Sequence, residues 1–168
     1  MTGSPTTTGT LTTERLPLRP WQPEDAQAAL EIYGDADVAR WLAMPAGRWA
    51  VERTADRYVI GGAELLPLPP GDEDLEIAWQ LNPAAWGHGY ADEAMFAVAS
   101  WAFDHDVDEL FTVIRPENTE TAATVRQNGM HWVGETTKYF GLELQVFRLR
   151  QADLDRTAPT AHRPPSYA

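Results

Sequence analysis

Two glycines stand close together in the run from Trp86 to Ala94, which reads W-G-H-G-Y-A-D-E-A. Gly87 and Gly89 follow an apolar, strand-like segment and precede a helix-like one. Glycine lets a backbone approach a bulky group closely and aim several N–H donors at one point. The first N–H groups of a helix lack partners within it and lie at its positive dipole end, so this junction suits a diphosphate. Its spacing matches neither G-x-G-x-x-G nor G-x-x-x-x-G-K-[ST].

The neighbouring elements must place this loop at the end of a sheet. We predict a strand from Leu75 to Asn82, a helix from Ala91 to about His105, and a short apolar strand from Leu110 to Ile114. Elements of these lengths form a βαβ unit, so the two strands should be parallel neighbours. Ligands of such sheets bind outside the carboxyl ends of the strands. If the strands separate there, a linear molecule can lie between them like an extra strand.

The rest of the chain predicts a mixed sheet with flanking helices. Arg15–Arg19 alternates like a short strand, and Pro17 within it indicates a sheet edge. Pro23 should begin a helix, because its missing N–H is harmless at a first helical position. The apolar stripe of that helix is expected to be Ala26, Ala29, Leu30 and Tyr33. Further strands are expected at Trp49–Arg53, Tyr58–Leu66, His131–Glu135 and Leu144–Arg148, and further helices at Asp35–Leu42 and at Thr119–Asn128, the latter closed by Gly129.

Composition limits the function. The chain has 168 residues and a formal net charge of −12, which argues against nucleic acid as a partner. It has no cysteine, and its four histidines lack metal-ligand spacing, so we expect no metal. We see neither a signal segment nor an apolar run of membrane-spanning length, which predicts a cytoplasmic protein with no membrane partner. We expect disorder over residues 1–10, a single domain over 11–155, and a flexible Pro-rich tail over 156–168.

Two more motifs accompany the glycine loop. Residues 113–121 read V-I-R-P-E-N-T-E-T and are followed by Gly129-Met130, and residues 13–21 read T-E-R-L-P-L-R-P-W. With the loop, these motifs resemble the GNAT N-acetyltransferases, in particular the branch that acetylates the N termini of ribosomal proteins (the RimJ/RimL type). The resemblance spans roughly residues 13–154. It implies a GNAT fold, namely a mixed, mostly antiparallel α/β sheet with one central parallel crossover, and acetyl-CoA as the acyl donor.

Candidate cofactor contacts follow from the expected slot. The N–H groups of Gly87, Gly89, Tyr90 and Ala91 would hold the diphosphate, and His88 could touch a phosphate or face solvent. Backbone groups of Trp79 and Leu81 would pair with the amide arm of the donor, and an N–H near Gln80 or Leu81 would polarise the thioester carbonyl. The resemblance implies that Asn118 also reaches the pantetheine arm. Trp86 stands where the wider family often has Gln or Arg, so that contact is missing.

The catalytic residues are harder to assign, because the chain departs from the family pattern. The family's tyrosine acid, four residues before the closing glycine, is Val125 here, and its mid-strand glutamate is Val113. Thr121 stands where a serine acid is often found, although a packing or helix-start role fits it equally well. Tyr139 is a fallback acid candidate, after the reading of a strand aromatic packed on a neighbour. Glu76 is the best carboxylate candidate for a base, with a solvated strand-entry charge as its alternative; Glu93 reads as a partner of the helix dipole.

These observations predict an acetyl-CoA-dependent N-acetyltransferase. The acceptor would be a primary amine, either a peptide or protein α-amine or a small-molecule amine, attacking directly in a ternary complex. The missing tyrosine and the uncertain base leave a second hypothesis, a catalytically silent acyl-CoA-binding or regulatory module. A third reading, in which the glycines form only a strand-to-helix turn, does not account for the paired motifs. The protein could be a monomer or a homodimer.

Overall fold

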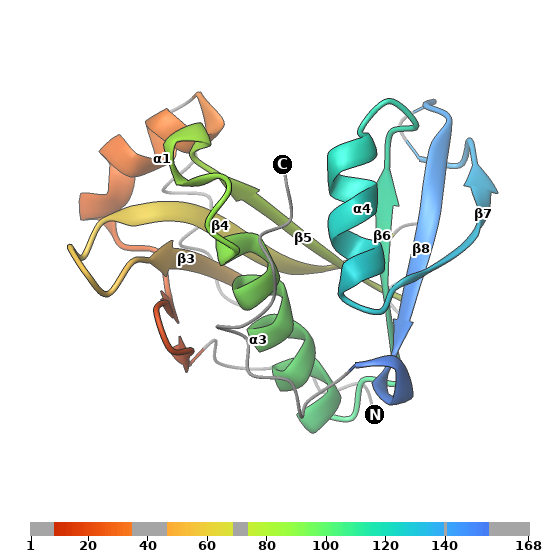
Figure 1. Ribbon diagram of the computed structural model, residues 1–168, viewed down its shortest axis with the longest axis horizontal. Coiled ribbons are helices and arrows are strands. Elements are labelled where there is room, and N and C mark those ends of the chain that lie inside the picture. Colours follow the sequence, from red (N-terminus) through yellow and green to blue (C-terminus); the bar gives the residue numbers. More distant parts are fainter. Residues whose placement is uncertain (1–8, 35–46, 69–73, 140, 155–168) are drawn as a thin grey trace.

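The computed structural model describes residues 9–34, 47–68, 74–139 and 141–154 (Figure 1). The strands are β1 (Leu11–Thr12), β2 (Pro17–Arg19), β3 (Arg48–Glu52), β4 (Val59–Pro67), β5 (Leu75–Leu81), β6 (Glu109–Ile114), β7 (His131–Thr136) and β8 (Leu144–Arg150). The α-helices are α1 (Ala26–Tyr33), α3 (Tyr90–Asp104) and α4 (Thr119–Gln127), and the 3-10 turns are η1 (Pro23–Asp25), η2 (Pro83–Ala85) and η3 (Gln151–Asp153).

The strands form one eight-stranded sheet in the order β1-β2-β3-β4-β5-β6-β8-β7. β5 and β6 pair in parallel, and the other described neighbours pair antiparallel. Helix α3 follows β5 and leads to β6, so the predicted βαβ crossover joins two neighbouring strands of the sheet. The predicted fold, a mixed and mostly antiparallel α/β sheet with one central parallel crossover, is confirmed.

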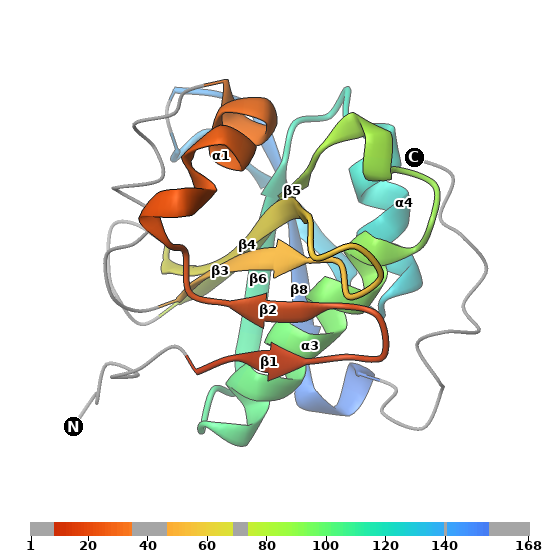
Figure 2. The same cartoon turned by 90° about the vertical axis from the view of Figure 1, so that its left-hand side faces the viewer.

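Alternation along β3 shows how the helices cover the two faces of the sheet. Trp49 and Val51 are fully buried in the main core, which they share with side chains of α3, α4 and β8. Ala50, between them, belongs to a smaller cluster with Ala29 and Ile32 of α1. Successive strand side chains point to opposite faces, so α3 and α1 pack on opposite sides of the sheet. The first strand, β1, lies beside α3 at the edge of the sheet (Figure 2).

Two local predictions are wrong. The strand that contains Pro17 is not an edge, because β1 pairs outside it and places Thr12 opposite Pro17. A strand of two residues is too short to show periodicity, so the sequence did not reveal it. On α1, Leu30 is 41% exposed and Ile32 is buried in its place. Both residues lie within one turn of Ala29, and only the contact with the sheet decides between them.

Other expectations fall outside the described residues. The helix expected at Asp35–Leu42 is one of these, and so are most of residues 1–10 and the tail over 156–168. The domain limits therefore stay predictions. Within the described ranges, no helix is long and apolar enough to cross a membrane. Among the same residues, His, Asp and Glu side chains do not gather in a group of three that could hold a metal ion.

Candidate active site

The parallel strands β5 and β6 separate toward their carboxyl ends. They pair at Leu75↔Leu110 and Glu76↔Phe111, near the start of each strand, and the register continues no further. The Thr112 hydroxyl then donates to the Ile77 carbonyl at 2.6 Å and bridges the beginning of the gap. The slot expected between two diverging strands is therefore present.

The peptide groups of β5 alternate between its two neighbours. The carbonyl of Ile77 points toward β6, because it accepts from Thr112. Trp79 and Leu81 lie two and four residues further along, so their peptide groups face the same gap. Gln80 lies on the alternate register, opposite Gly62 of β4. Of the two residues considered as oxyanion donors, Leu81 therefore has its N–H on the side of the gap, whereas that of Gln80 is directed toward β4.

The glycine loop closes one end of this gap. Gly87 and Gly89 have φ angles of +80° and +77°, a backbone region in which other residues are strained. Helix α3 begins directly afterwards at Tyr90, and its first N–H groups have no partner within the helix. The predicted strand-to-helix junction is present, and the positive φ angles are a further reason for glycine at both positions. Trp86, which is 51% exposed, donates its indole N–H to the Leu81 carbonyl at 3.2 Å and so links the loop to the end of β5.

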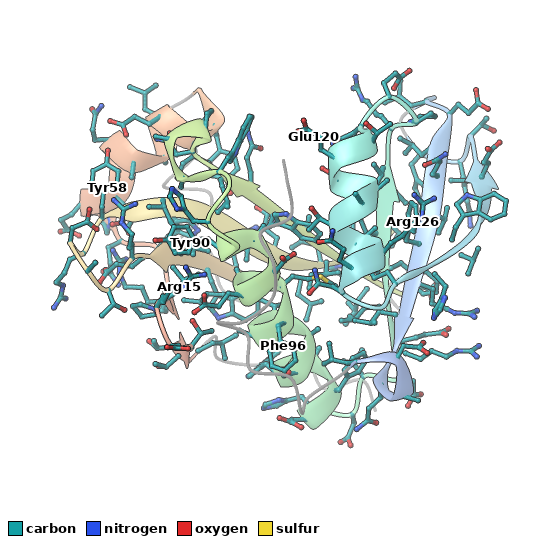
Figure 3. All side chains as sticks on the ribbon, viewed as in Figure 1. Arg15, Tyr58, Tyr90, Phe96, Glu120 and Arg126 are labelled. Carbon is teal, nitrogen blue, oxygen red and sulfur yellow. The ribbon has the colours of Figure 1, made fainter. Side chains whose placement is uncertain are left out.

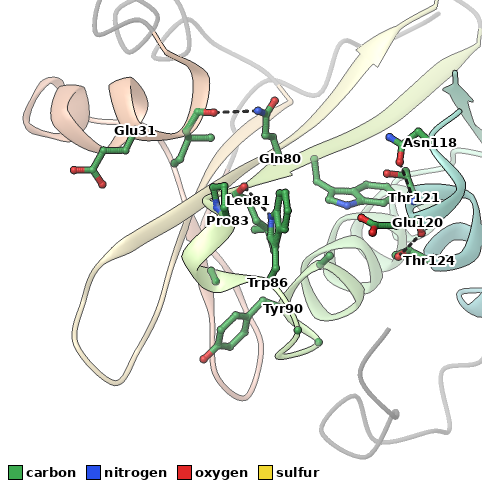
Figure 4. Close-up of a pocket in the computed structure, with 16 residues that line it drawn as sticks. Glu31, Gln80, Leu81, Pro83, Trp86, Tyr90, Asn118, Glu120, Thr121 and Thr124 are labelled. Atoms are coloured by element: carbon green, nitrogen blue, oxygen red, sulfur yellow. Dashed lines mark hydrogen bonds between the residues drawn. The ribbon is translucent and has the colours of Figure 1, made fainter. Parts of the chain in front are cut away.

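A cavity of about 510 Å³ lies between this loop and the start of α4 (Figure 4). Its walls come from β5, η2, the glycine loop, α1 and α4. A second cavity, of about 290 Å³, opens between β5 and β6 and includes Glu76 in its wall. Trp79, Asn118 and Thr121 line both cavities. Together the two cavities run from the glycine loop to the Glu76 carboxyl. The predicted cofactor residues that line the larger one are Trp79, Leu81, Gly87, Gly89, Tyr90, Ala91 and Asn118.

Asn118 and Thr121 belong to the beginning of α4. The Asn118 side-chain oxygen accepts a hydrogen bond from the Thr121 backbone N–H at 3.1 Å and caps the helix. The helix-start role considered for Thr121 thus involves its backbone, and the side chain of Asn118 supplies the cap. Within the described part of the chain, no hydrogen bond is found for the Thr121 hydroxyl. Its half-buried side chain lines both cavities.

Glu76 is half-buried rather than fully solvated. Burial raises the pKa of its carboxyl, the backbone N–H of Val113 opposes that shift, and the negative charge of Glu64 adds to it. Glu64, on β4, stands opposite Ala78 of β5, so it shares a sheet face with Glu76. Burial also raises the pKa of Glu64, while Arg48 opposes this. Our sequence reasoning missed Glu64, although a lone charge within the apolar strand segment G-G-A-E-L-L was a usable signal.

Tyr139 and His88 line neither cavity. Burial is the main cause that raises the pKa of the Tyr139 phenol. The negative charges of Asp74 and Glu76 raise this pKa further, so Tyr139 lies within electrostatic reach of Glu76. The His88 side chain is exposed, and its ring lies 5.5 Å from that of Tyr90. The backbone carbonyl of His88 accepts a hydrogen bond from Arg15. The roles suggested for Tyr139 and His88 stay predictions.

Two carboxylates in the first turn of α3 are buried beneath the loop. Asp92 is 3% exposed and accepts from the Asn128 side-chain amide at 2.7 Å, which ties α3 to the end of α4. Glu93 is 1% exposed and forms a salt bridge with Arg15 at 2.8 Å. Glu93 is therefore more than a dipole partner. Neither pairing could be predicted from the sequence, because the partners lie far away along the chain.

Comparisons with known proteins agree with this architecture. Residues 43–131 match the acetyltransferase (GNAT) domain, and the chain belongs to this family. Members of the family transfer an acetyl group, and acetyl-CoA is their usual donor. The chain is 28% identical over 145 residues to YnaD of Bacillus subtilis, described as an uncharacterized N-acetyltransferase; the match covers 74% of this chain and 84% of that protein.

Solved structures share the fold. A GNAT-family acetyltransferase from Bacillus anthracis superposes with a TM-score of 0.72 at 19% identity, covering 86% of this chain and 99% of that one. RimJ of Mycobacterium smegmatis, solved in complex with CoA-disulfide, gives a TM-score of 0.67 at 18% identity, covering 92% of each chain. At these identities the likeness concerns the fold alone.

Proposed function

We propose that this protein transfers an acetyl group from acetyl-CoA to a primary amine by direct attack in a ternary complex. The observation that carries the proposal is the pair of cavities between the glycine loop and Glu76, which share Trp79, Asn118 and Thr121 in their walls. A diphosphate would bind at one end, beside the glycine loop and the N terminus of α3, and Glu76, whose pKa burial raises, stands at the other. A linear thioester placed along this path would bring its reactive carbon near Trp79 and Thr121.

The loop residues Gly87, Gly89, Tyr90 and Ala91 would hold the diphosphate through their N–H groups, with His88 as a further phosphate contact. Trp79, Leu81 and Asn118 would hold the pantetheine arm. The orientation of the β5 peptides supports this, because Trp79 and Leu81 face the gap. The side-chain oxygen of Asn118 already caps α4, so its amide NH₂ is the group that would donate to the arm.

The Leu81 N–H would stabilise negative charge on the thioester oxygen, because it lies in the gap and belongs to a rigid strand. Loss of one such donor in other enzymes raises the barrier by ~3 kcal/mol. The Leu81 carbonyl accepts from the Trp86 indole, which holds the next peptide group, Leu81–Asn82, at the end of β5.

Glu76 would accept the proton that the attacking amine must lose. A carboxylate is ordinarily a weak base, and burial and the charge of Glu64 make this one stronger. Thr121 would donate a proton to the departing thiolate, because its side chain lines both cavities. Tyr139 is the second candidate acid; burial and then the neighbouring carboxylates raise the pKa of its phenol and so keep it protonated.

One observation favours the alternative of a silent acyl-CoA-binding or regulatory module. Val125 takes the place of the family's tyrosine acid, and its side chain is fully buried in the main core. Because Val125 fills this position in the core, no acidic side chain can take the place of the missing tyrosine through a small movement. In that alternative Glu76 and Thr121 would only shape the slot.

The branch of the family and the setting are also proposals. The T-E-R-L opening and the RimJ fold likeness support a RimJ/RimL-type relative, for which a peptide α-amine is the first acceptor to test. We further propose a single domain over 11–155 that acts in the cytoplasm without a metal, as a monomer or a homodimer.

Thermal unfolding with and without acetyl-CoA tests the donor. At 100 times its dissociation constant, a ligand that binds only the folded chain adds about 2.7 kcal/mol of stability. Turnover on a panel of peptide α-amines and small amines then separates the enzyme from the silent module. Release of the CoA thiol can be followed with a thiol reagent, because the chain has no cysteine to react. Stabilisation without turnover on any amine would favour the silent module, and no stabilisation would refute both.

A further inference from the structure

A buried carboxylate joins the N-terminal segment to the first turn of α3. Glu93 is 1% exposed. Its Oε1 accepts from the Thr13 hydroxyl at 2.5 Å and from the Arg15 backbone N–H at 2.8 Å, and its Oε2 accepts from Arg15 Nε at 2.8 Å. The partners lie about eighty positions apart in the chain, at separations of 80 and 78 residues. One side chain thus holds the segment between β1 and β2 against the start of α3.

Arg15 continues from Glu93 to the glycine loop. Its Nη2 donates to the His88 carbonyl at 2.9 Å, and its guanidinium carbon lies 4.5 Å from the centre of the Tyr90 ring. Figure 3 shows Arg15 and Tyr90 together beside the N-terminal end of α3, with α4 on the other side of that helix. Arg15 therefore contacts the glycine loop on the side opposite α4, whose residues form a wall of the cavity.

The bond to His88 sets the direction of the following N–H. A trans peptide is planar, and its C=O and N–H point in opposite directions. The carbonyl of His88 and the N–H of Gly89 belong to one peptide. Because Arg15 draws this carbonyl to its own side, the Gly89 N–H must point the other way. Gly89 lines the large cavity, where the diphosphate is proposed to bind.

Charge compensation is the second consequence. A carboxylate in the first turn of α3 stands close to the proposed diphosphate and would repel it. The Arg15 guanidinium neutralises Glu93 without entering the cavity, so the helix N terminus remains attractive to an anion.

We infer that Arg15 is a positioning residue for donor binding: held by Glu93, which also accepts from Thr13, it orients the His88–Gly89 peptide toward the diphosphate. The inference rests on the proposed function, and it gives the T-E-R opening a physical role in the cofactor site. Lysine at this position would keep a positive charge near Glu93, but it lacks the planar fork that reaches Glu93 and His88 together.

The test compares two donors that differ in their phosphates. Acetyl-CoA carries the diphosphate, whereas S-acetylpantetheine has the same thioester arm and none. Arg15→Lys should raise the dissociation constant for CoA and the KM for acetyl-CoA about tenfold, equivalent to about 1.4 kcal/mol, the size of one hydrogen bond to a charged group. Its kcat, and its kcat/KM with S-acetylpantetheine, should stay within about twofold of wild type. A change of that size corresponds to less than about 0.5 kcal/mol.

Two further variants guard against a purely structural effect. Arg150→Lys changes a comparable but surface-exposed arginine–carboxylate pair, with Glu109 at 3.4 Å, and should leave CoA affinity unchanged. Arg15→Met with Glu93→Gln removes both charges, so it folds without an unpaired buried carboxylate and should still show the loss of CoA affinity.

The outcomes separate the two ideas. Equal losses on both donors, or wild-type CoA affinity in Arg15→Lys and in the double variant, would overturn the positioning role while leaving the proposed function intact. Failure of the wild-type chain to bind CoA would overturn both.

Discussion

Replacing Thr121 with valine removes one hydroxyl and keeps the shape of the side chain. If that hydroxyl protonates the leaving thiolate, kcat should fall about 100-fold or more, which corresponds to about 2.7 kcal/mol in the activation barrier. Affinity for CoA should not change, because the arm is proposed to be held by Trp79, Leu81 and Asn118.

The structure also sets the expected effect of Thr121→Val on stability. The Thr121 backbone N–H donates to the capping oxygen of Asn118 at 3.1 Å, and the substitution leaves that bond in place. We therefore expect the free energy of unfolding to stay within about 0.5 kcal/mol of wild type. The rival helix-start role resides in Asn118, where substitution by alanine should cost about 1 kcal/mol of stability.

The assay is single-turnover acetyl transfer on the best amine of the panel, with urea unfolding measured in parallel. Thr119→Val, two residues earlier on an exposed position of the same turn, is the matched control for adding a valine to this helix end. A wild-type rate in Thr121→Val would refute the acid assignment and direct the next substitution to Tyr139. A rate loss accompanied by an equal loss of stability would mean that the side chain only packs.

Three further predictions follow from the site. Glu76→Gln should lower kcat/KM about 100-fold and abolish its fall toward acid pH, because the wild-type base is lost as pH drops through the raised pKa of Glu76; a pH–rate profile measures both. Gly87→Ala should weaken CoA binding modestly through strain at φ +80°, and Gly87→Glu far more through added repulsion; calorimetry compares the pair, and equal losses would place the diphosphate elsewhere. Asn128→Ala should cost about 2 kcal/mol of stability by weakening the pairing of buried Asp92, as urea unfolding would show.

The local order of strands, helices and loop could be predicted from the sequence. Lengths and periodicity around Gly87 and Gly89 were enough to place a parallel crossover and a helix N terminus, because both follow from neighbouring residues. The pairing of Arg15 with Glu93 could not be predicted, since no local pattern connects residues 78 positions apart. Glu64 carried a local signal, a lone charge in an apolar strand segment, but its closeness to Glu76 depends on the register between β4 and β5 and could not be predicted.

Glu64 and Glu76 have a consequence for stability that bears on function. Each pKa is raised in the folded chain, so the folded state binds protons more readily than the unfolded one. Their contribution to stability is therefore present at acid pH and is lost as pH rises through the folded pKa values. At neutral pH two half-buried carboxylates on one sheet face weaken the fold, where apolar or neutral side chains would not. Residues that lower the stability of the folded state are often found at functional sites. Glu76→Gln should accordingly be at least as stable as wild type at pH above neutral while it loses activity, and a variant that lost both together would show that the carboxylate serves the sheet rather than the reaction.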